Sequence, residues 1–96
     1  MDSAVQERAD VFQCLTDEEL MSGVANADVN SFNVIFNRYY KQIFNFIKKS
    51  VHDHVASEDI TQEVFMRIFK SAARFDPERK FSSWIYKIAL NEIKRY

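Results

Sequence analysis

The 96-residue sequence contains one glycine, one proline and one cysteine. This is too little glycine and proline for the many tight turns of a β-sandwich or β-barrel, and it excludes a glycine-rich phosphate loop. The single cysteine, Cys14, cannot form an internal disulfide, which favours a reducing compartment such as the cytoplasm. No apolar run approaches the ~18–20 residues of a membrane span, and the first residues lack the pattern of a signal peptide. We therefore expect a helical protein that does not insert into membranes.

Length and composition indicate one globular domain with a steep charge gradient. Apolar residues make up 47% of the chain and charged residues 28%, as in ordinary soluble domains. Residues 1–37 carry seven acidic side chains and one basic side chain, whereas residues 64–96 carry eight basic and three acidic ones. The basic third favours an anionic partner at one end of the chain. An uneven surface charge without a partner is the alternative at this point.

The spacing of apolar residues predicts an all-α fold, a compact bundle of about four helices. The longest predicted helix is rich in aromatic residues, so we expect it at the centre of the bundle. Side chains that favour helix N-termini set the expected boundaries. The predicted segments are a loose acidic arm at 1–15 and helices at 17–26 after a capping box of Thr16 and Glu19, at 29–51 after Asp28 or Asn30, at 58–74 after Ser57, and from Ser82 or Ser83 to the end.

No arrangement of residues predicts an enzyme. The sequence lacks a serine–histidine–aspartate order, and no histidine lies near Cys14. Paired acids such as Glu58 and Asp59 lie where helix N-termini favour acidic side chains. His52 and His54 do not have the spacing of a metal site. We therefore expect no catalytic residue, no metal and no cofactor.

One side of the helix predicted at 58–74 is polar. The residues of this polar stripe are Asp59, Gln62, Glu63, Met66 and Lys70, and apolar residues at 60, 64 and 68 face the other way. The stripe indicates either a solvated surface or a contact for another protein.

Basic and aromatic side chains alternate in the loop at 75–81 and in the last predicted helix. Cations near phosphates give salt-dependent affinity for nucleic acids, and aromatic faces let unpaired bases stack at ~1–3 kcal/mol per base. The pattern favours binding of single-stranded nucleic acid, and the alternative is that Trp84 and Tyr86 are core residues. The residues concerned are Arg74, Phe75, Arg79, Lys80, Phe81, Trp84, Tyr86, Lys87, Asn91, Lys94 and Arg95.

Two runs carry a resemblance to a known family: ASEDITQEVF at 56–65 and FSSWIYKIALN at 81–91. Upstream, DEEL at 17–20, Ala27–Asp28 and Ser31–Phe32 leading to Arg38–Tyr39 agree with the same pattern. Together they resemble region 2 of bacterial RNA polymerase sigma factors of the extracytoplasmic-function (ECF) group, over residues 16–96. The family often has glycine where this chain has Ala27.

The resemblance implies two binding surfaces, which we expect to be separate. One binds the clamp helices of the polymerase β′ subunit, and its residues here are Asp59, Gln62, Glu63, Phe65, Met66 and Phe69. The other captures the single-stranded non-template strand of the promoter −10 element and receives one flipped base in a pocket around Phe75, Tyr86 and Asn91. The complete expected DNA surface comprises Arg67, Phe75, Arg79, Lys80, Phe81, Ser82, Trp84, Tyr86, Lys87, Asn91, Lys94 and Arg95.

The resemblance also implies a wider setting. Full-length family members carry a C-terminal domain that binds the −35 element, and because this sequence lacks it, we expect one domain of a longer protein. We further expect a bacterial cytoplasmic location, a monomer when free, and an anti-sigma factor as a regulatory partner. Two alternatives stay open: a helical adaptor that binds only proteins, and a sequence-blind binder of single-stranded nucleic acid.

Overall fold

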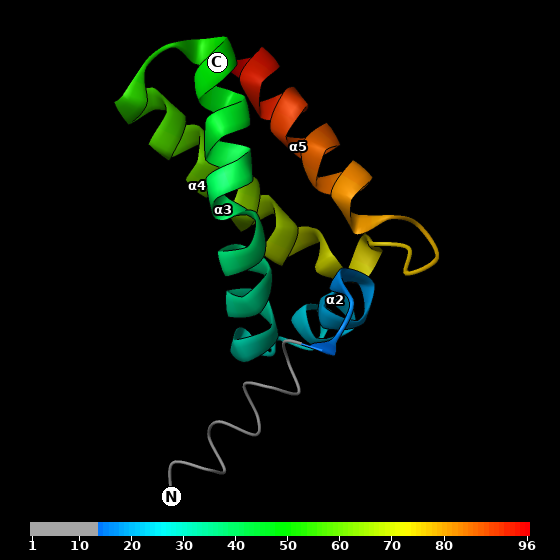
Figure 1. Cartoon of the computed structure of the whole chain (residues 1–96). Coiled ribbons are helices and arrows are strands. Elements are labelled where there is room, and N and C mark those ends of the chain that lie inside the picture. Colours follow the sequence, from blue (N-terminus) through cyan, green and yellow to red (C-terminus); the bar gives the residue numbers. More distant parts are fainter. Residues whose placement is uncertain (1–13) are drawn as a thin grey trace, which may run out of the picture.

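The computed structural model describes residues 14–96, which form four α-helices and one short 3-10 helix (Figure 1). Within this range there is no strand, so the predicted all-α bundle of about four helices is confirmed. The arm predicted at 1–15 lies almost entirely outside the described residues. No helix in the described range is both long and apolar enough to cross a bilayer. The elements are α2 (Asp17–Ala25), α3 (Val29–Val51), α4 (His54–Ser71), η1 (Ala72–Arg74) and α5 (Phe81–Arg95).

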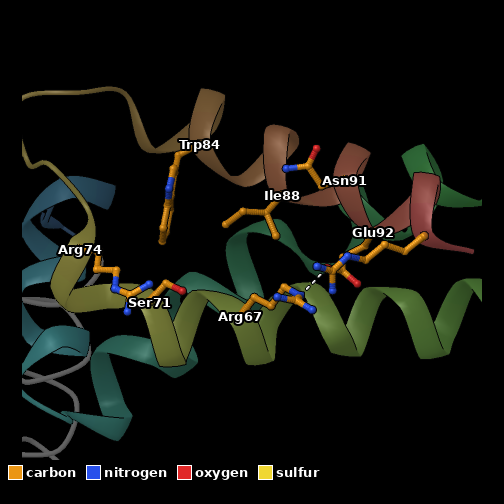
Figure 2. Close-up of a pocket in the computed structure, with 8 residues that line it drawn as sticks. Arg67, Ser71, Arg74, Trp84, Ile88, Asn91 and Glu92 are labelled. Atoms are coloured by element: carbon orange, nitrogen blue, oxygen red, sulfur yellow. Dashed lines mark ion pairs between the residues drawn. The ribbon is translucent and has the colours of Figure 1, made fainter.

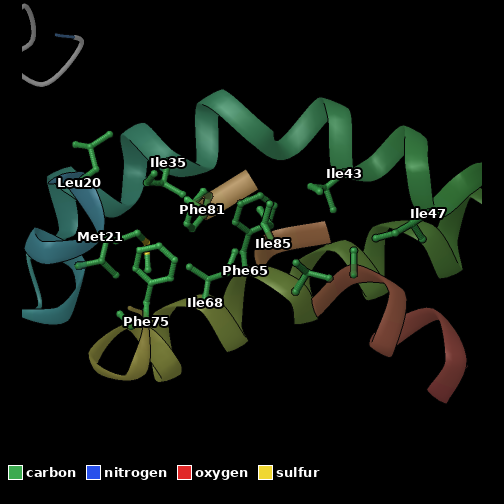
Figure 3. Packing of buried hydrophobic residues seen from close by; sticks show 14 of the residues in the cluster. Leu20, Met21, Ile35, Ile43, Ile47, Phe65, Ile68, Phe75, Phe81 and Ile85 are labelled. Carbon is green, nitrogen blue, oxygen red and sulfur yellow. The ribbon is translucent and has the colours of Figure 1, made fainter. Parts of the chain in front are cut away.

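The long helix α3 is the centre of the bundle, as its aromatic content predicted. It contacts α2, α4 and α5, and α4 in turn lies against α5 (Figure 1). Isoleucines of α3 are fully buried against α4 and α5, together with Phe81 and Ile85 at the start of α5 (Figure 3). The side chains that are fully excluded from solvent include Leu20, Ile35, Ile43, Ile47, Val64, Ile68, Phe81, Ile85 and Ala89.

Local capping residues fix the ends of α2 and α3 as expected. The Thr16 hydroxyl accepts the Glu19 N–H and the Glu19 carboxylate accepts the Thr16 N–H, each at 3.1 Å, which completes the capping box. Asp28 caps α3 by accepting the Asn30 N–H at 3.0 Å. Both caps join residues at most three apart, which is why the sequence alone predicts them.

Two predicted helix starts are wrong. The third helix begins at His54 and is capped by Asp53, whose carboxylate accepts the N–H groups of Val55 and Ala56. Ser57 lies one turn inside that helix, where it is buried and its hydroxyl donates to the Asp53 carbonyl. The connector before α4 is therefore only two residues, the first of which, His52, has a left-handed backbone.

The last helix begins at Phe81, before the serines that we expected to cap it. Its N-cap residue, Lys80, makes no side-chain cap hydrogen bond. Instead, the Glu18 carboxylate of α2 accepts the Phe81 N–H at 2.9 Å, across 63 positions of sequence. This distant carboxylate also suits the positive end of the α5 dipole. Ser82 and Ser83 lie within the first turn of the helix.

The junction between α2 and α3 explains the placement of the only glycine. Gly23 of α2 lies so close to α3 that a Cβ atom there would stand 2.2 Å from the Ser31 hydroxyl oxygen and 2.9 Å from its Cβ. The Ser31 hydroxyl is itself held by a 3.0 Å hydrogen bond to Asp28. In the turn that joins α2 to α3, Ala27 has φ 62°, a backbone region that favours glycine. The chain therefore has its glycine where helices approach closely and alanine where the turn is strained.

We predict opposite effects from exchanging these two residue types. Gly23→Ala will lower the free energy of unfolding by ~1–2 kcal/mol, because overpacking against Ser31 outweighs the gain in helix propensity. Ala27→Gly will raise it by up to ~1 kcal/mol, because relief of the left-handed strain exceeds the added entropy of the unfolded chain. Urea unfolding followed by circular dichroism measures both. Ser22→Ala, exposed on the same helix, is the control, and a Gly23→Ala protein as stable as this control would contradict the packing argument.

Candidate nucleic-acid interface

A cavity of about 300 Å³ lies between α4 and α5 (Figure 2). This volume is at the lower end of the range for small-ligand sites, which suits one small planar group. Three of its lining residues are arginines, and the others include an indole, an amide and a carboxylate. The complete lining is Arg67, Ser71 and Arg74 from α4 and η1, with Trp84, Ile88, Asn91, Glu92 and Arg95 from α5.

The Trp84 indole closes one end of the cavity. Figure 2 shows it reaching from α5 toward α4, with Ile88 between it and the opposite end of the cavity. Rings beneath it hold it in place: the Phe75 centroid lies 5.0 Å away and the Phe81 centroid 5.9 Å away. Because Phe75 and Phe81 are buried, the half-buried indole has a firm support and still lines the cavity. An aromatic face in this setting can stack on a planar heterocycle.

An ion pair between Arg67 and Glu92 closes the other end (Figure 2). The Glu92 side chain is only 9% exposed, and glutamate is rarely buried unless it is paired. The Arg67 Nε atom also lies 3.7 Å from the Glu63 carboxylate, one turn earlier on α4. Arg67 therefore lies between a residue of the polar stripe and a residue of the cavity. The two surfaces that we expected to be separate meet at this guanidinium.

The loop between η1 and α5 is anchored at both ends and exposed in between. Phe75 and Phe81 are buried, whereas residues 76–80 are all exposed. The Asp76 carboxylate accepts the Glu78 N–H at 3.0 Å, and the Asp76 carbonyl accepts the Arg79 N–H at 3.0 Å, so the loop contains a defined turn. This turn projects Arg79 and Lys80 into solvent beside the start of α5.

The structure brings four of the expected DNA-surface residues together at the cavity: Arg67, Trp84, Asn91 and Arg95. Arg79, Lys80, Lys87 and Lys94 are exposed on the loop and on α5 but do not line the cavity, and Ser82 is half-buried. The sequence reasoning missed Ser71, Ile88 and Glu92 and did not assign Arg74 to the pocket. Helical spacing could have identified them, since Ser71 and Arg74 follow Arg67 by four and seven residues, and Ile88 and Glu92 follow Trp84 by four and eight.

The expected roles of three aromatic residues need correction. Phe81 is fully buried, so its side chain belongs to the core and does not face a ligand. Phe75 is 8% exposed and supports the indole from beneath. Tyr86 does not line the cavity, because it packs edge-on against Phe46 of α3 with the ring centroids 5.1 Å apart. Asn91 is the one residue of the expected base pocket that lines the cavity.

The polar stripe on α4 is exposed as predicted. Asp59, Gln62 and Glu63 face solvent, and Met66 is 50% exposed among them. Phe69, 44% exposed, packs edge-on against Phe32 of α3. These five residues form an outer α4 surface of mixed polar and apolar character.

Phe65 does not belong to that surface. It is 2% exposed, and its ring packs against the rings of Phe36 and Tyr40 on α3. The expectation that Phe65 contacts a partner is therefore wrong, and its role is to hold α4 on α3.

Comparisons with known proteins agree on one family. Residues 35–96 match the model of sigma-70 region 2. The chain is 32% identical over 82 residues to an ECF RNA polymerase sigma-E factor of Haemophilus influenzae, covering 85% of this chain and 43% of that protein. It is 29% identical over 80 residues to an RNA polymerase sigma-H factor of Pseudomonas aeruginosa, covering 83% of this chain and 42% of that protein. The chain thus spans less than half the length of these relatives.

A solved structure is similar in fold and in sequence. It is an engineered region 2 of sigmaE, determined by NMR in complex with GTAAAA. The TM-score is 0.79 and the identity 34%, with 85% of each chain covered.

The hydrogen bond from Phe81 to Glu18 leads to a prediction about how α5 is held. Glu18→Ala will lower the free energy of unfolding by ~1 kcal/mol, because it removes both a cap and a favourable charge at the helix N-terminus. Urea unfolding measures the loss, and Glu78→Ala, in the exposed loop, is the matched control. If the two variants unfold at the same urea concentration, the contact does not stabilise the start of α5.

Proposed function

The chain belongs to the sigma-70 region 2 family, and we propose that it is a domain of a transcription initiation factor. In this role it binds the β′ clamp helices of RNA polymerase and recognises the promoter −10 element as the duplex opens. It captures one base, flipped from the non-template strand, in the cavity between α4 and α5. The domain acts by binding rather than by catalysis.

The cavity is the observation that carries this proposal. A flipped base has lost its stacking and pairing, at a cost of a few kcal/mol, and a receiving site must offset that loss. Trp84 offers a face for stacking, and Asn91 offers both a donor and an acceptor for a base edge. The similar sigmaE domain, solved with GTAAAA, supports the choice of DNA as the ligand.

Four exposed cations on the loop and on α5 suit the phosphate backbone. Arg79 and Lys80 project from the loop, and Lys87 and Lys94 lie on the outer side of α5. Phosphate contacts fix the position of a strand, whereas base contacts specify its sequence. The proposal therefore assigns position to these four cations and specificity to the cavity.

The outer α4 surface is the proposed site for the clamp. Asp59, Gln62 and Glu63 supply charge and hydrogen bonds there, and Met66 and Phe69 supply apolar area. Methionine at 50% exposure is suited to a protein contact, since its flexible side chain adapts to a partner surface. Glu63 also lies near Arg67, so this surface adjoins the cavity.

The wider role follows from the same proposal. The domain works in the bacterial cytoplasm, where the polymerase is, and it is a monomer when free. An anti-sigma factor inhibits it by covering the outer α4 surface and the cavity. Without polymerase, this domain by itself binds DNA weakly.

Two substitutions will separate base recognition from phosphate binding. Asn91→Ala will reduce discrimination at one position of a single-stranded −10-like oligonucleotide by ~1–3 kcal/mol, because it removes a base contact. Lys87→Ala will weaken binding to all sequences about equally and will flatten the dependence of affinity on salt. Affinities for four oligonucleotides that differ at one base, each at two salt concentrations, test both.

These measurements also decide between the proposal and its alternatives. Sequence-blind binding by the parent would favour a nonspecific single-strand binder. Absence of DNA binding would favour an adaptor that contacts only proteins. If the Asn91→Ala variant ranks the four oligonucleotides in the same order as the parent, with the same differences in affinity, the cavity does not read the base.

The clamp assignment is tested on residues that lie away from the cavity. Gln62→Ala will weaken binding to a β′ clamp fragment by ~5-fold or more, which corresponds to ~1 kcal/mol, and will leave DNA affinity unchanged. Lys41→Ala, exposed on α3, is the control. Equal clamp affinity of Gln62→Ala, the control and the parent would place the clamp site elsewhere.

A further inference from the structure

We propose that the Arg67–Glu92 ion pair makes the cavity selective for cytosine or adenine, whose amino group lies beside a ring acceptor, over thymine. This inference rests on the proposed function, because it takes the cavity to be the site of the flipped base. Glu92 is the specificity-determining residue, and Arg67 positions its carboxylate.

The placement of Glu92 is unusual for a glutamate on a basic surface. Its neighbours on α5, Asn91, Lys94 and Arg95, are exposed, whereas the Glu92 side chain is only 9% exposed. It lines the cavity, and it also borders a smaller hollow of about 220 Å³ with Asp59, Ile60, Glu63, Arg95 and Tyr96. A carboxylate held in this position by Arg67 presents a fixed charge to whatever enters the cavity.

The ion pair leaves hydrogen-bonding capacity on both partners. An ionised carboxylate only accepts, and its two oxygens have about four lone-pair sites. The contacts of Arg67 with Glu92 and Glu63 are both made through Nε, and a guanidinium has four further N–H donors on its terminal nitrogens. The closed end of the cavity therefore offers an acceptor directly beside a donor.

The remaining cavity wall supplies donors. Arg74 and Arg95 only donate, and Ser71 and Asn91 can donate or accept. Among the described residues that line the cavity, Glu92 is the carboxylate, so it is the strongest acceptor that an incoming base meets. A change at Glu92 should consequently alter the choice of base.

The four bases differ in what they present to such a pair. Cytosine carries the amino donor N4 beside the acceptor N3, and adenine carries N6 beside N1. The amino group can donate to Glu92 while the ring nitrogen accepts from Arg67. Thymine carries a keto oxygen beside a ring N–H and has no amino group, so the keto oxygen would face the carboxylate and leave two acceptors opposed. Glutamate accepting from cytosine N4 is a known base contact.

The test uses base analogues that differ in a single group. Single-stranded −10-like oligonucleotides will carry dC, dU, dA or deoxyinosine at the candidate flipped position. Uracil differs from cytosine by a keto oxygen at position 4, and inosine differs from adenine by a keto oxygen at position 6. The parent chain is expected to prefer dC over dU, and dA over deoxyinosine, by about tenfold, which corresponds to ~1.4 kcal/mol.

Glu92→Gln is the diagnostic variant. Its amide can turn either an acceptor or a donor toward the base. The preference for dC over dU and that for dA over deoxyinosine should therefore both fall to affinity ratios of about twofold or less. Glu58→Gln removes the same charge from α4 away from the cavity, and it should retain the parent's ratios. Because the measured quantity is a ratio of affinities within one protein, a lower folded fraction of the variant does not change it.

The outcomes separate this inference from the proposed function. If the parent does not bind the oligonucleotides, or binds all four equally while Asn91→Ala also changes nothing, the proposed function fails. A second outcome would overturn the inference alone: the parent discriminates among the bases and the Asn91→Ala variant does not, but Glu92→Gln keeps the parent's ratio of affinities for dC and dU. The cavity would then read the base without Glu92. A parent preference for dU or deoxyinosine would overturn it as well.

Discussion

The contacts of Phe81 determine where the last helix begins, and the candidate site depends on that position. The Phe81 N–H donates to Glu18 of α2, and the Phe81 ring packs edge-on against Tyr39 of α3 with centroids 5.2 Å apart. The same ring lies next to Phe75 and Trp84. One residue thus ties α2 and α3 to the loop at 75–80 and to the indole that closes the cavity. The exposed loop can present its cations because its two aromatic ends are fixed in the core.

Helix α2, which holds the start of α5, is itself anchored on α3. Asp17, one residue before Glu18, pairs with Arg38 at 2.9 Å and accepts a hydrogen bond from the Tyr39 hydroxyl. Burial, followed by the hydrogen bond to Asp17, raises the pKa of this hydroxyl above its ordinary value, so it remains a donor even at a pH where a free tyrosine ionises. The acidic first turn of α2 therefore has two functions beyond its own helix dipole. Asp17 holds α2 on α3, and Glu18 holds α5 on α2.

The sequence predicts features that depend on neighbours along one helix. The capping box at Thr16 and Glu19, the cap at Asp28 and the exposed stripe on α4 all rest on offsets of a few residues. Asp53 and Ser57 are both good caps, and only the packed helix shows which one is used.

Other features depend on distant residues and could not be predicted in this way. The contact of Glu18 with Phe81 joins positions 63 residues apart, and no local pattern indicates it. Phe81 and Tyr86 belong to the same basic–aromatic run as Trp84, yet the packing of α5 turns Phe81 into the core and Tyr86 toward Phe46. The spacing within α5 places Glu92 on the side of Trp84, but its burial depends on the ion pair with Arg67 on α4, which that spacing does not indicate.

Because Trp84 is the only tryptophan in the sequence and closes the cavity, its fluorescence reports directly on occupation of the site. The decisive measurement is a titration of Trp84 emission with a single-stranded −10-like oligonucleotide and with the same strand lacking the base at the candidate position. Binding of both strands is followed independently by anisotropy of a terminal label. If a base enters the cavity, the complete strand will quench Trp84 strongly and the abasic strand will bind with little quenching. Equal quenching by the two strands at saturation would contradict capture of a base between α4 and α5.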